Sequence, residues 1–169
     1  MKKISVILLS LVMGMMLTVN AQAPYRHSIG VTLGNMEAFS YKTFLTDNFA
    51  LSVDAGFKWT FAATRYGSGI SMSIEANPNF MYEAATGVDG LHWLAGGGLS
   101  LGMALPQVIG GSVAGKFGIN AIGGVEYKFK IPLTLQADFR PGYGLLFNDD
   151  YGASYFDWGI CVGVRYTIK

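Results

Sequence analysis

The sequence predicts an all-β fold: an eight-stranded antiparallel up-and-down transmembrane β-barrel that follows a cleavable signal peptide. Three observations lead to this fold class. Hydrophobic residues make up 51% of the chain and charged residues only 14%, yet no apolar run long enough for a transmembrane helix follows residue 19. The 23 glycines and the 14% aromatic content favour strands and tight turns over helices. Apolar and polar residues also alternate along eight separate segments, as they do in strands with two unlike faces.

The last of these segments, 156–169, shows what the alternation implies. Its large apolar face carries Trp158, Ile160, Val162, Val164, Tyr166 and Ile168. Its small or charged face carries Asp157, Gly159, Cys161, Gly163, Arg165, Thr167 and Lys169. Successive side chains of a strand point to opposite sides, so this strand separates an apolar environment from a polar one. A soluble sheet buries its apolar face and a membrane barrel turns that face to lipid, and one strand alone is compatible with both.

The N-terminus has the pattern of a secretory signal. Lys2 and Lys3 precede an apolar run, 4–19, and Ala21-Gln22-Ala23 fits a small-residue cleavage site after Gln22 or Ala23. A membrane anchor is the alternative, but the run is short for one. We therefore expect a signal peptide at 1–22 and an outer-membrane β-barrel domain at 23–169, exported to the outer membrane of a Gram-negative bacterium.

The first four strands are expected at 27–35, 38–45, 49–60 and 69–83. Short turns at 35–37 and 46–48 and a polar loop at 62–68 connect them. Pro78 interrupts the fourth strand, so we expect a bulge or the end of the strand there.

The last four strands are expected at 91–105, 117–129, 133–146 and 156–169. They are joined by the connections 86–90, 106–116, 130–132 and 147–154. An even number of strands puts both termini on one side. With an exported N-terminus in the periplasm, the turns 46–48, 86–90 and 130–132 are periplasmic, and the connections 35–37, 61–68, 106–116 and 147–154 are extracellular. Longer outer connections are usual for such barrels, and the 35–37 turn is the exception.

Charged residues are expected to fall on the inward faces of these strands. The ten lumen residues are Lys42, Asp54, Lys58, Glu75, Glu126, Lys128, Asp138, Arg140, Asp157 and Arg165. They comprise five acids and five bases, and the membrane-spanning outward faces carry no charge. An eight-stranded barrel has an interior just wide enough for side chains to fill, so we expect a closed ion-pair network rather than a narrow ion-conducting path.

Aromatic residues are expected to form belts at the two membrane interfaces, because their rings are favoured at headgroup level. The girdle residues are Trp59, Trp93, Tyr127, Phe129 and Trp158.

No enzyme site is predicted, and hence no catalytic residue. The two histidines, His27 and His92, lie at the expected periplasmic strand ends, away from the outer loops. Asp149-Asp150 would give at most a weak calcium site, and Gly96-Gly97-Gly98 lacks the helix that follows a phosphate loop. We therefore expect no cofactor and no metal site, and the formal net charge of +1 gives no reason to expect a nucleic-acid partner. The single cysteine, Cys161, is expected to fill space in the lumen.

Three stretches carry a resemblance to a known family. They are Phe44-Leu45-Thr46-Asp47-Asn48-Phe49-Ala50-Leu51, Gly123-Gly124-Val125-Glu126-Tyr127-Lys128-Phe129-Lys130-Ile131-Pro132-Leu133, and the ending Gly163-Val164-Arg165-Tyr166-Thr167. The exported chain resembles small outer-membrane β-barrel proteins of the Bacteroidetes type, which are similar in fold to OmpX and to the membrane domain of OmpA. This resemblance implies insertion by the barrel-assembly machinery, which reads the last strand, and Gly163, Tyr166 and Ile168 match its assembly signal. Lys169 and Cys161 depart from that signal.

The leading functional hypothesis is a monomeric barrel surrounded by outer-membrane lipid, with a structural or surface-interaction role. The alternative is a narrow porin-like channel or transport protein. A soluble lipocalin-like binder is also an eight-stranded barrel, but it predicts an apolar lumen. A lipid-modifying barrel enzyme is disfavoured because no histidine lies at the outer rim.

Overall fold

The computed structural model describes residues 25–64, 67–105, 112–148 and 152–168. The predicted signal peptide and the Asp149-Asp150 pair lie outside these residues. Within the described part of the chain, no helix has the length and hydropathy needed to cross a membrane.

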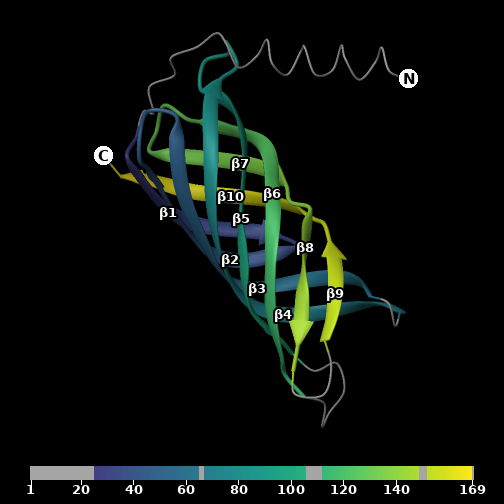
Figure 1. The fold of residues 1–169 in the computed structure, drawn as a ribbon. Coiled ribbons are helices and arrows are strands. Elements are labelled where there is room, and N and C mark those ends of the chain that lie inside the picture. The colour runs from purple at the N-terminus through teal and green to yellow at the C-terminus, as the bar shows by residue number, and fades with distance from the viewer. Residues whose placement is uncertain (1–24, 65–66, 106–111, 149–151, 169) are drawn as a thin grey trace, which may run out of the picture.

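Ten strand segments make up the structure (Figure 1). They are β1 (His27–Gly34), β2 (Met36–Phe44), β3 (Phe49–Thr64), β4 (Gly67–Ala85), β5 (Leu91–Ala104), β6 (Ala114–Lys128), β7 (Leu133–Phe139), β8 (Gly142–Phe147), β9 (Gly152–Asp157) and β10 (Ile160–Ile168). All neighbours pair antiparallel, and β10 closes the wall by pairing with β1.

The ten segments form eight strands. β7 and β8 share one register on β6, in which Gly123 pairs with Phe139 and Gly115 with Phe147. β9 and β10 likewise share one register on β8 and β7. Each pair is therefore one strand with a local break, and the prediction of a closed eight-stranded antiparallel barrel is confirmed.

The side chains alternate between lumen and exterior. Along β2 the burial pattern is strictly alternating from Met36 to Lys42, with Ser40 and Lys42 buried and Phe39 and Tyr41 exposed. The same holds along β10, where Cys161 and Arg165 are buried and Ile160 is 62% exposed. The apolar face points outward and the polar face inward, the reverse of a soluble barrel and the arrangement of a barrel whose solvent is lipid.

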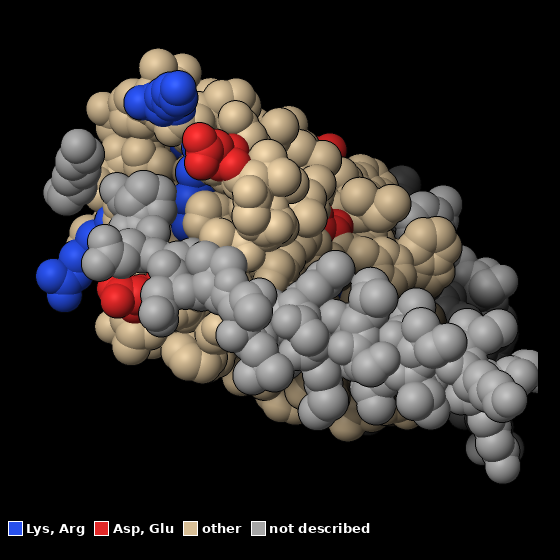
Figure 2. Space-filling model, turned by 90° about the horizontal axis from the view of Figure 1, so that it is seen from above, with Lys and Arg blue, Asp and Glu red and all other residues tan. Residues whose placement is uncertain are grey.

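Both described ends of the chain lie at one end of the barrel, where His27 pairs with Ile168. The connections 45–48, 86–90 and 129–132 lie at this same end, which we call the terminal end, and the opposite end is the hairpin end. Viewed onto the terminal end, most visible described atoms belong to uncharged residues, and the few visible Lys, Arg, Asp and Glu atoms lie mainly toward the left side of the picture (Figure 2).

Three predicted outer connections are shorter in the structure than the sequence suggested. β3 continues to Thr64 and β4 begins at Gly67, so the loop expected at 62–68 is mostly paired strand. β6 begins at Ala114 and β9 at Gly152, inside the loops expected at 106–116 and 147–154. Small residues such as Ala and Gly give little alternation between apolar and polar positions, but their backbone N–H and C=O groups can still form strand hydrogen bonds.

Pro78 does not cause the bulge or strand end that was expected. It pairs with Val53 of β3, and the β3–β4 register is continuous through it. On its other side, the pairing with β5 is interrupted between Ala76 and Asn79 and resumes in the same register. Proline has no N–H to donate, so the missing ladder bonds fall on the β5 side without displacing the strand.

The β1–β2 hairpin extends less far along the barrel than the β3–β4, β5–β6 and β8–β9 hairpins at the same end. Gly34, with φ of 125°, reverses the chain so that only Asn35 separates the two strands, where a turn at 35–37 was expected. A positive φ of this kind is readily adopted only by glycine. Asn35 is held from both sides: its N–H donates to the Ile160 carbonyl at 3.2 Å, and its carbonyl accepts from Trp59 N–H at 2.8 Å.

The breaks between β7 and β8 and between β9 and β10 allow the barrel wall to close beyond the end of the short β1–β2 hairpin. Arg140-Pro141 and Trp158-Gly159 lie opposite each other, and Arg140 N–H donates to the Gly159 carbonyl at 2.9 Å. β10 pairs with β1, whereas β9, on the other side of the break, pairs with β3 through Ala63 and Phe156. In the described residues, the wall therefore narrows from eight strands at the terminal end to six at the hairpin end: β3, β4, β5, β6, β8 and β9.

We predict that Gly159→Ala destabilises the barrel by about 1–3 kcal/mol, because a Cβ there would lie 2.0 Å from Asn35 Cγ and overpack the junction. The measurement is urea unfolding in lipid vesicles. Gly123→Ala is the matched control, because a Cβ at Gly123 meets nothing within 4 Å. The double variant with Asn35→Ala removes the clashing atoms and should recover part of the loss; equal destabilisation by both alanines would contradict the junction described here.

Candidate functional site: the charged lumen

The lumen holds twelve buried charged side chains among the described residues. They are Lys42, Asp54, Lys58, Glu75, Glu83, Lys116, Glu126, Lys128, Asp138, Arg140, Asp157 and Arg165. None is more than 7% exposed. All ten residues expected in the lumen are placed there, and Glu83 and Lys116 join them, which keeps the interior balanced at six acids and six bases. The contacts divide these residues into three layers of four.

The terminal layer consists of Lys42, Glu83, Glu126 and Lys128, from β2, β4 and β6. Lys42 lies between the two acids: it contacts Glu83, and its Nζ is 2.8 Å from Glu126 Oε2. Lys128 Nζ lies 3.1 Å from Glu83 Oε2. Lys42 of β2 thereby joins the carboxylates of β4 and β6, so that three strands are linked across the lumen.

An aromatic plug covers the terminal layer. Tyr25, Phe44 and Ala50 form a buried apolar cluster there, and the Tyr25 hydroxyl donates to Glu126 Oε1 at 2.7 Å. Lys128 Nζ lies 5.3 Å from the Tyr25 ring centroid and 4.9 Å from that of Phe44, both within cation–π range. Burial, with the neighbouring Glu126 carboxylate, raises the pKa of the Tyr25 phenol above its ordinary value, so Tyr25 stays a neutral donor.

The middle layer consists of Asp54, Asp138, Arg140 and Arg165. Arg140 bridges both acids, with Nη1 2.6 Å from Asp54 Oδ2 and Nε 2.5 Å from Asp138 Oδ1. Charge-assisted bonds of this kind are the strongest hydrogen bonds in proteins, and the planar guanidinium can make several at once.

Arg165 joins the middle layer to the terminal layer. Its Nη2 lies 4.0 Å from Asp54 Oδ1, and its Nη1 lies 3.7 Å from Glu126 Oε2. Nε donates to Ser40 Oγ and Nη1 to Gln136 Oε1, both at 2.8 Å. Arg165 therefore touches groups on four other strands, β2, β3, β6 and β7, and holds them at a fixed spacing around the lumen.

The hairpin layer consists of Lys58, Glu75, Lys116 and Asp157, from β3, β4, β6 and β9. Lys58 Nζ is 2.7 Å from Asp157 Oδ2, and Lys116 Nζ is 2.5 Å from Glu75 Oε1. Each lysine is also 3.8–3.9 Å from the other acid. Lys116 further donates to Thr60 Oγ1 at 2.6 Å and lies 4.6 Å from the Tyr155 ring centroid.

Each layer contains two acids and two bases, so each is neutral by itself. Removing charges from water is costly unless each is paired, and a neutral layer meets this requirement locally. The ion pairs within the described residues link the terminal and middle layers but not the middle and hairpin layers. Polar and apolar packing occupies other parts of the lumen, as in the cluster of Met81, Leu94 and Ile122.

Two lumen charges and one exterior charge were missed in the sequence. Glu83 has the same parity as Glu75 and would have been found by continuing the alternation past Pro78. Lys116 has the parity of Asn120 and would have been found by starting that strand earlier. Glu37 is an exposed acid on the outward face of β2, where no strand charge was expected. The sequence placed it in the turn expected at 35–37, whereas β2 already begins at Met36.

The expected girdle residues all lie on the outward faces, at two levels. Trp93, Tyr127 and Phe129 are near the terminal end, where the last two contact each other with ring centroids 4.8 Å apart. Trp59 and Trp158 are near the hairpin end and are 41% and 53% exposed. Tyr155, by contrast, points into the lumen and is 2% exposed.

The proposed assembly-signal residues split between the two faces of β10. Tyr166 and Ile168 point outward and are 57% and 43% exposed. Gly163 points inward, where a Cβ would lie 3.2 Å from the Arg165 guanidinium, so its small size leaves room for that side chain.

The remaining candidate groups stay apart from one another. The His27 ring nitrogen is 2.9 Å from the Tyr41 hydroxyl on the exterior, and His92 lies beside the Gly90 carbonyl at the terminal end. Cys161 is a buried free thiol whose Sγ is 3.1 Å from Asn35 Oδ1. In the described ranges, no three His, Cys, Asp or Glu residues are grouped in a way that could hold a metal ion.

A closed eight-stranded barrel with an apolar exterior, two aromatic levels and a charged interior is an outer-membrane β-barrel by fold. The chain is similar to the crystal structure of Neisserial surface protein A (NspA), with a TM-score of 0.55 and 17% identity over 84% of this chain and 94% of that one. It also matches the backbone structure of the Yersinia pestis outer membrane protein Ail in a phospholipid bilayer nanodisc, with a TM-score of 0.36 and 12% identity over 83% and 97% of the two chains.

No protein-family model and no curated protein matches the chain. The likeness to NspA supports the fold.

We predict that Asp138→Leu destabilises the barrel by about 3–5 kcal/mol, because it leaves a buried positive charge in the middle layer. Asp138 contacts Arg140 and Gln136, so Arg140 loses one of its two carboxylate partners and keeps only Asp54. Arg165 is affected only indirectly, through Gln136. Urea unfolding measures the loss. Asp47→Leu, in an exposed turn, should change stability by less than about 0.5 kcal/mol. Unchanged stability of Asp138→Leu together with raised conductance would sink the closed-network interpretation.

We also predict that ion pairs couple within a layer and not between the middle and hairpin layers. In double-mutant cycles, Lys116→Gln with Glu75→Gln should show a coupling of about 0.5–3 kcal/mol, because the two groups are in contact. Lys116→Gln with Asp138→Asn should be additive within about 0.3–0.5 kcal/mol, because they share no partner. Coupling of equal size in both cycles would contradict the layered arrangement.

Proposed function

We propose that this protein is a structural component of the outer membrane of a Gram-negative bacterium, with a closed lumen and a hairpin end available for interactions at the cell surface. One observation carries the proposal: twelve charged side chains are buried among the described lumen residues, none more than 7% exposed, and each lies within 4.0 Å of a group of opposite charge. An eight-stranded barrel can be filled by its own side chains in this way, so the interior stabilises the wall and leaves little room for a permeating solute.

The lengths of the hairpins support a surface role. A strand needs about 9–11 residues to cross a bilayer at a tilt. β3 has 16 residues and β4 has 19, whereas β1 and β2 have 8 and 9. The longer hairpins therefore extend past the membrane at the hairpin end and form a platform there. With a periplasmic N-terminus, this platform faces the outside of the cell.

Further parts of the proposal rest on sequence patterns. The pattern at 1–22 supports export through a signal peptide, and the three stretches given above support a Bacteroidetes-type origin. The assembly-signal residues Gly163, Tyr166 and Ile168 support insertion by the barrel-assembly machinery. We propose a monomer surrounded by lipid, because the apolar exterior of every strand is suited to lipid contact. We further propose that the barrel has no enzymatic activity.

Planar-bilayer recording tests the closed lumen. We predict that the refolded barrel inserts without producing stepwise conductance, because three layers of paired side chains cross the lumen. A channel-forming porin in the same bilayer serves as the positive control, and β-rich circular dichroism of the inserted sample verifies folding. Reproducible conductance steps from the folded protein would contradict the proposal and favour the alternative, a narrow porin-like channel.

A further inference from the structure

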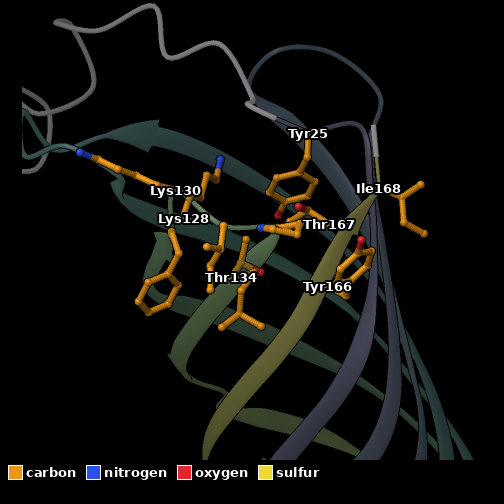
Figure 3. Close-up of a pocket in the computed structure, with 11 residues that line it drawn as sticks. Tyr25, Lys128, Lys130, Thr134, Tyr166, Thr167 and Ile168 are labelled. Atoms are coloured by element: carbon orange, nitrogen blue, oxygen red, sulfur yellow. The ribbon is translucent and has the colours of Figure 1, made fainter.

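The terminal end carries a second feature, a hollow of about 660 Å³ beside the 129–132 turn. It lies between the end of β6, the start of β7 and the end of β10. Its described lining includes the polar residues Lys128, Lys130 and Thr134 and the apolar or aromatic residues Tyr25, Leu133 and Tyr166. Figure 3 shows residues of the lumen and residues of the membrane-facing wall meeting around this one opening.

The polar side of the hollow is positively charged. Lys128 and Lys130 both line it, and the described lining contains no acid. Lys128 is held at the inner edge by Glu83 and by the Tyr25 ring, while Lys130 is exposed on the turn and extends outward in Figure 3. Two lysines at different depths are suited to a polyatomic anion, whose separate oxygen atoms can contact both ammonium groups.

A buried hydroxyl in the lining lacks a partner. Thr134 is 1% exposed, and its Oγ1 has no hydrogen bond. Buried polar groups in native structures are almost always hydrogen-bonded, so an unpartnered hydroxyl in a binding hollow indicates a missing acceptor. A phosphate oxygen is such an acceptor, and it would also accept from the two lysine ammonium groups.

The other side of the hollow is apolar and faces outward. Phe129 and Ile168 are 40% and 43% exposed, Tyr166 is 57% exposed, and Leu133 lies between them. These side chains continue into the apolar wall of the barrel, where acyl chains lie. A ligand that fits both sides has an anionic headgroup and a hydrocarbon tail.

We propose that this hollow binds the phosphate headgroup of an anionic phospholipid, with its acyl chains along Leu133 and Tyr166. Lys128, Lys130 and Thr134 supply the donors. Basic pockets at the membrane surface recognise anionic headgroups in this manner. The proposal rests on the placement of the barrel in a membrane but not on whether the lumen conducts. In the proposed orientation the lipid belongs to the inner leaflet of the outer membrane.

Native mass spectrometry of the folded barrel in a maltoside detergent tests this site. The probes are phosphatidylglycerol, which is anionic, and phosphatidylcholine, which has the same phosphate with a compensating cation. The wild type should retain phosphatidylglycerol in preference to phosphatidylcholine. Thr134→Val keeps the side-chain shape and breaks no hydrogen bond, and it should weaken phosphatidylglycerol binding roughly tenfold, as loss of a hydrogen bond to a charged group does.

Two further variants sharpen the test. Lys130→Gln should weaken phosphatidylglycerol binding roughly two- to fivefold, with an effect that shrinks as salt is raised. Ser28→Ala is the matched control: Ser28 is also a buried hydroxyl residue at the terminal end, but it does not line the hollow. It should leave lipid binding unchanged.

Competition with inorganic phosphate identifies the source of the anion. Retention of phosphatidylglycerol in excess phosphate supports the lipid. Displacement by phosphate would support a phosphate site but overturn its assignment to lipid. Equal retention of both lipids by the folded wild type, unaffected by Thr134→Val and Lys130→Gln, would overturn the site altogether. A chain that does not fold in detergent or lipid would instead overturn the proposed function.

Discussion

The structure depends on one constraint: charged groups on this chain can face neither lipid nor a water-filled channel. Hydrocarbon excludes them from the exterior, because a charge near the membrane midplane costs several kcal/mol. A narrow eight-stranded interior gives them little water, so each needs a partner of opposite sign. The three neutral layers meet both requirements. They also explain why the small residue Gly163 lies next to the large Arg165, since a fully packed lumen must alternate side-chain size.

The hairpin layer and the change in strand number depend on each other. Because the β1–β2 hairpin ends early, β9 must cross to β3, and the breaks at Pro141 and Gly159 permit this crossing. The crossing brings Asp157 of β9 to Lys58 of β3, at 2.7 Å. Lys116 and Glu75 connect β6 and β4 at the same level. The narrowing thus creates the contacts of this layer, and the ion pairs in turn hold the crossing in place.

Most of this fold could be predicted because strand alternation records which face meets lipid. Tyr41 and Lys42, adjacent in sequence, fall on opposite sides of the wall for that reason. The sequence could not show how far the strands pair where small residues weaken the alternation, as near Ala114. Lys116 was therefore not recognised as a lumen residue. The break at Arg140-Pro141 was also missed, because the register is the same on both sides and leaves no mark in the pattern.

Which charges pair could not be predicted either, since Lys42 meets Glu126 across 84 residues of chain through the closure of the barrel alone. The hollow beside the 129–132 turn combines residues of both faces and has no sequence signature.

Heat modifiability tests most directly whether the chain forms a closed barrel in a membrane-like solvent. The protein is folded in detergent and run on a denaturing gel with and without boiling. A closed barrel held by continuous strand pairing and buried ion pairs should resist the detergent, so the unboiled sample should migrate differently from the boiled one. Identical migration, from a protein that is soluble without detergent, would contradict the account and favour a soluble binding barrel.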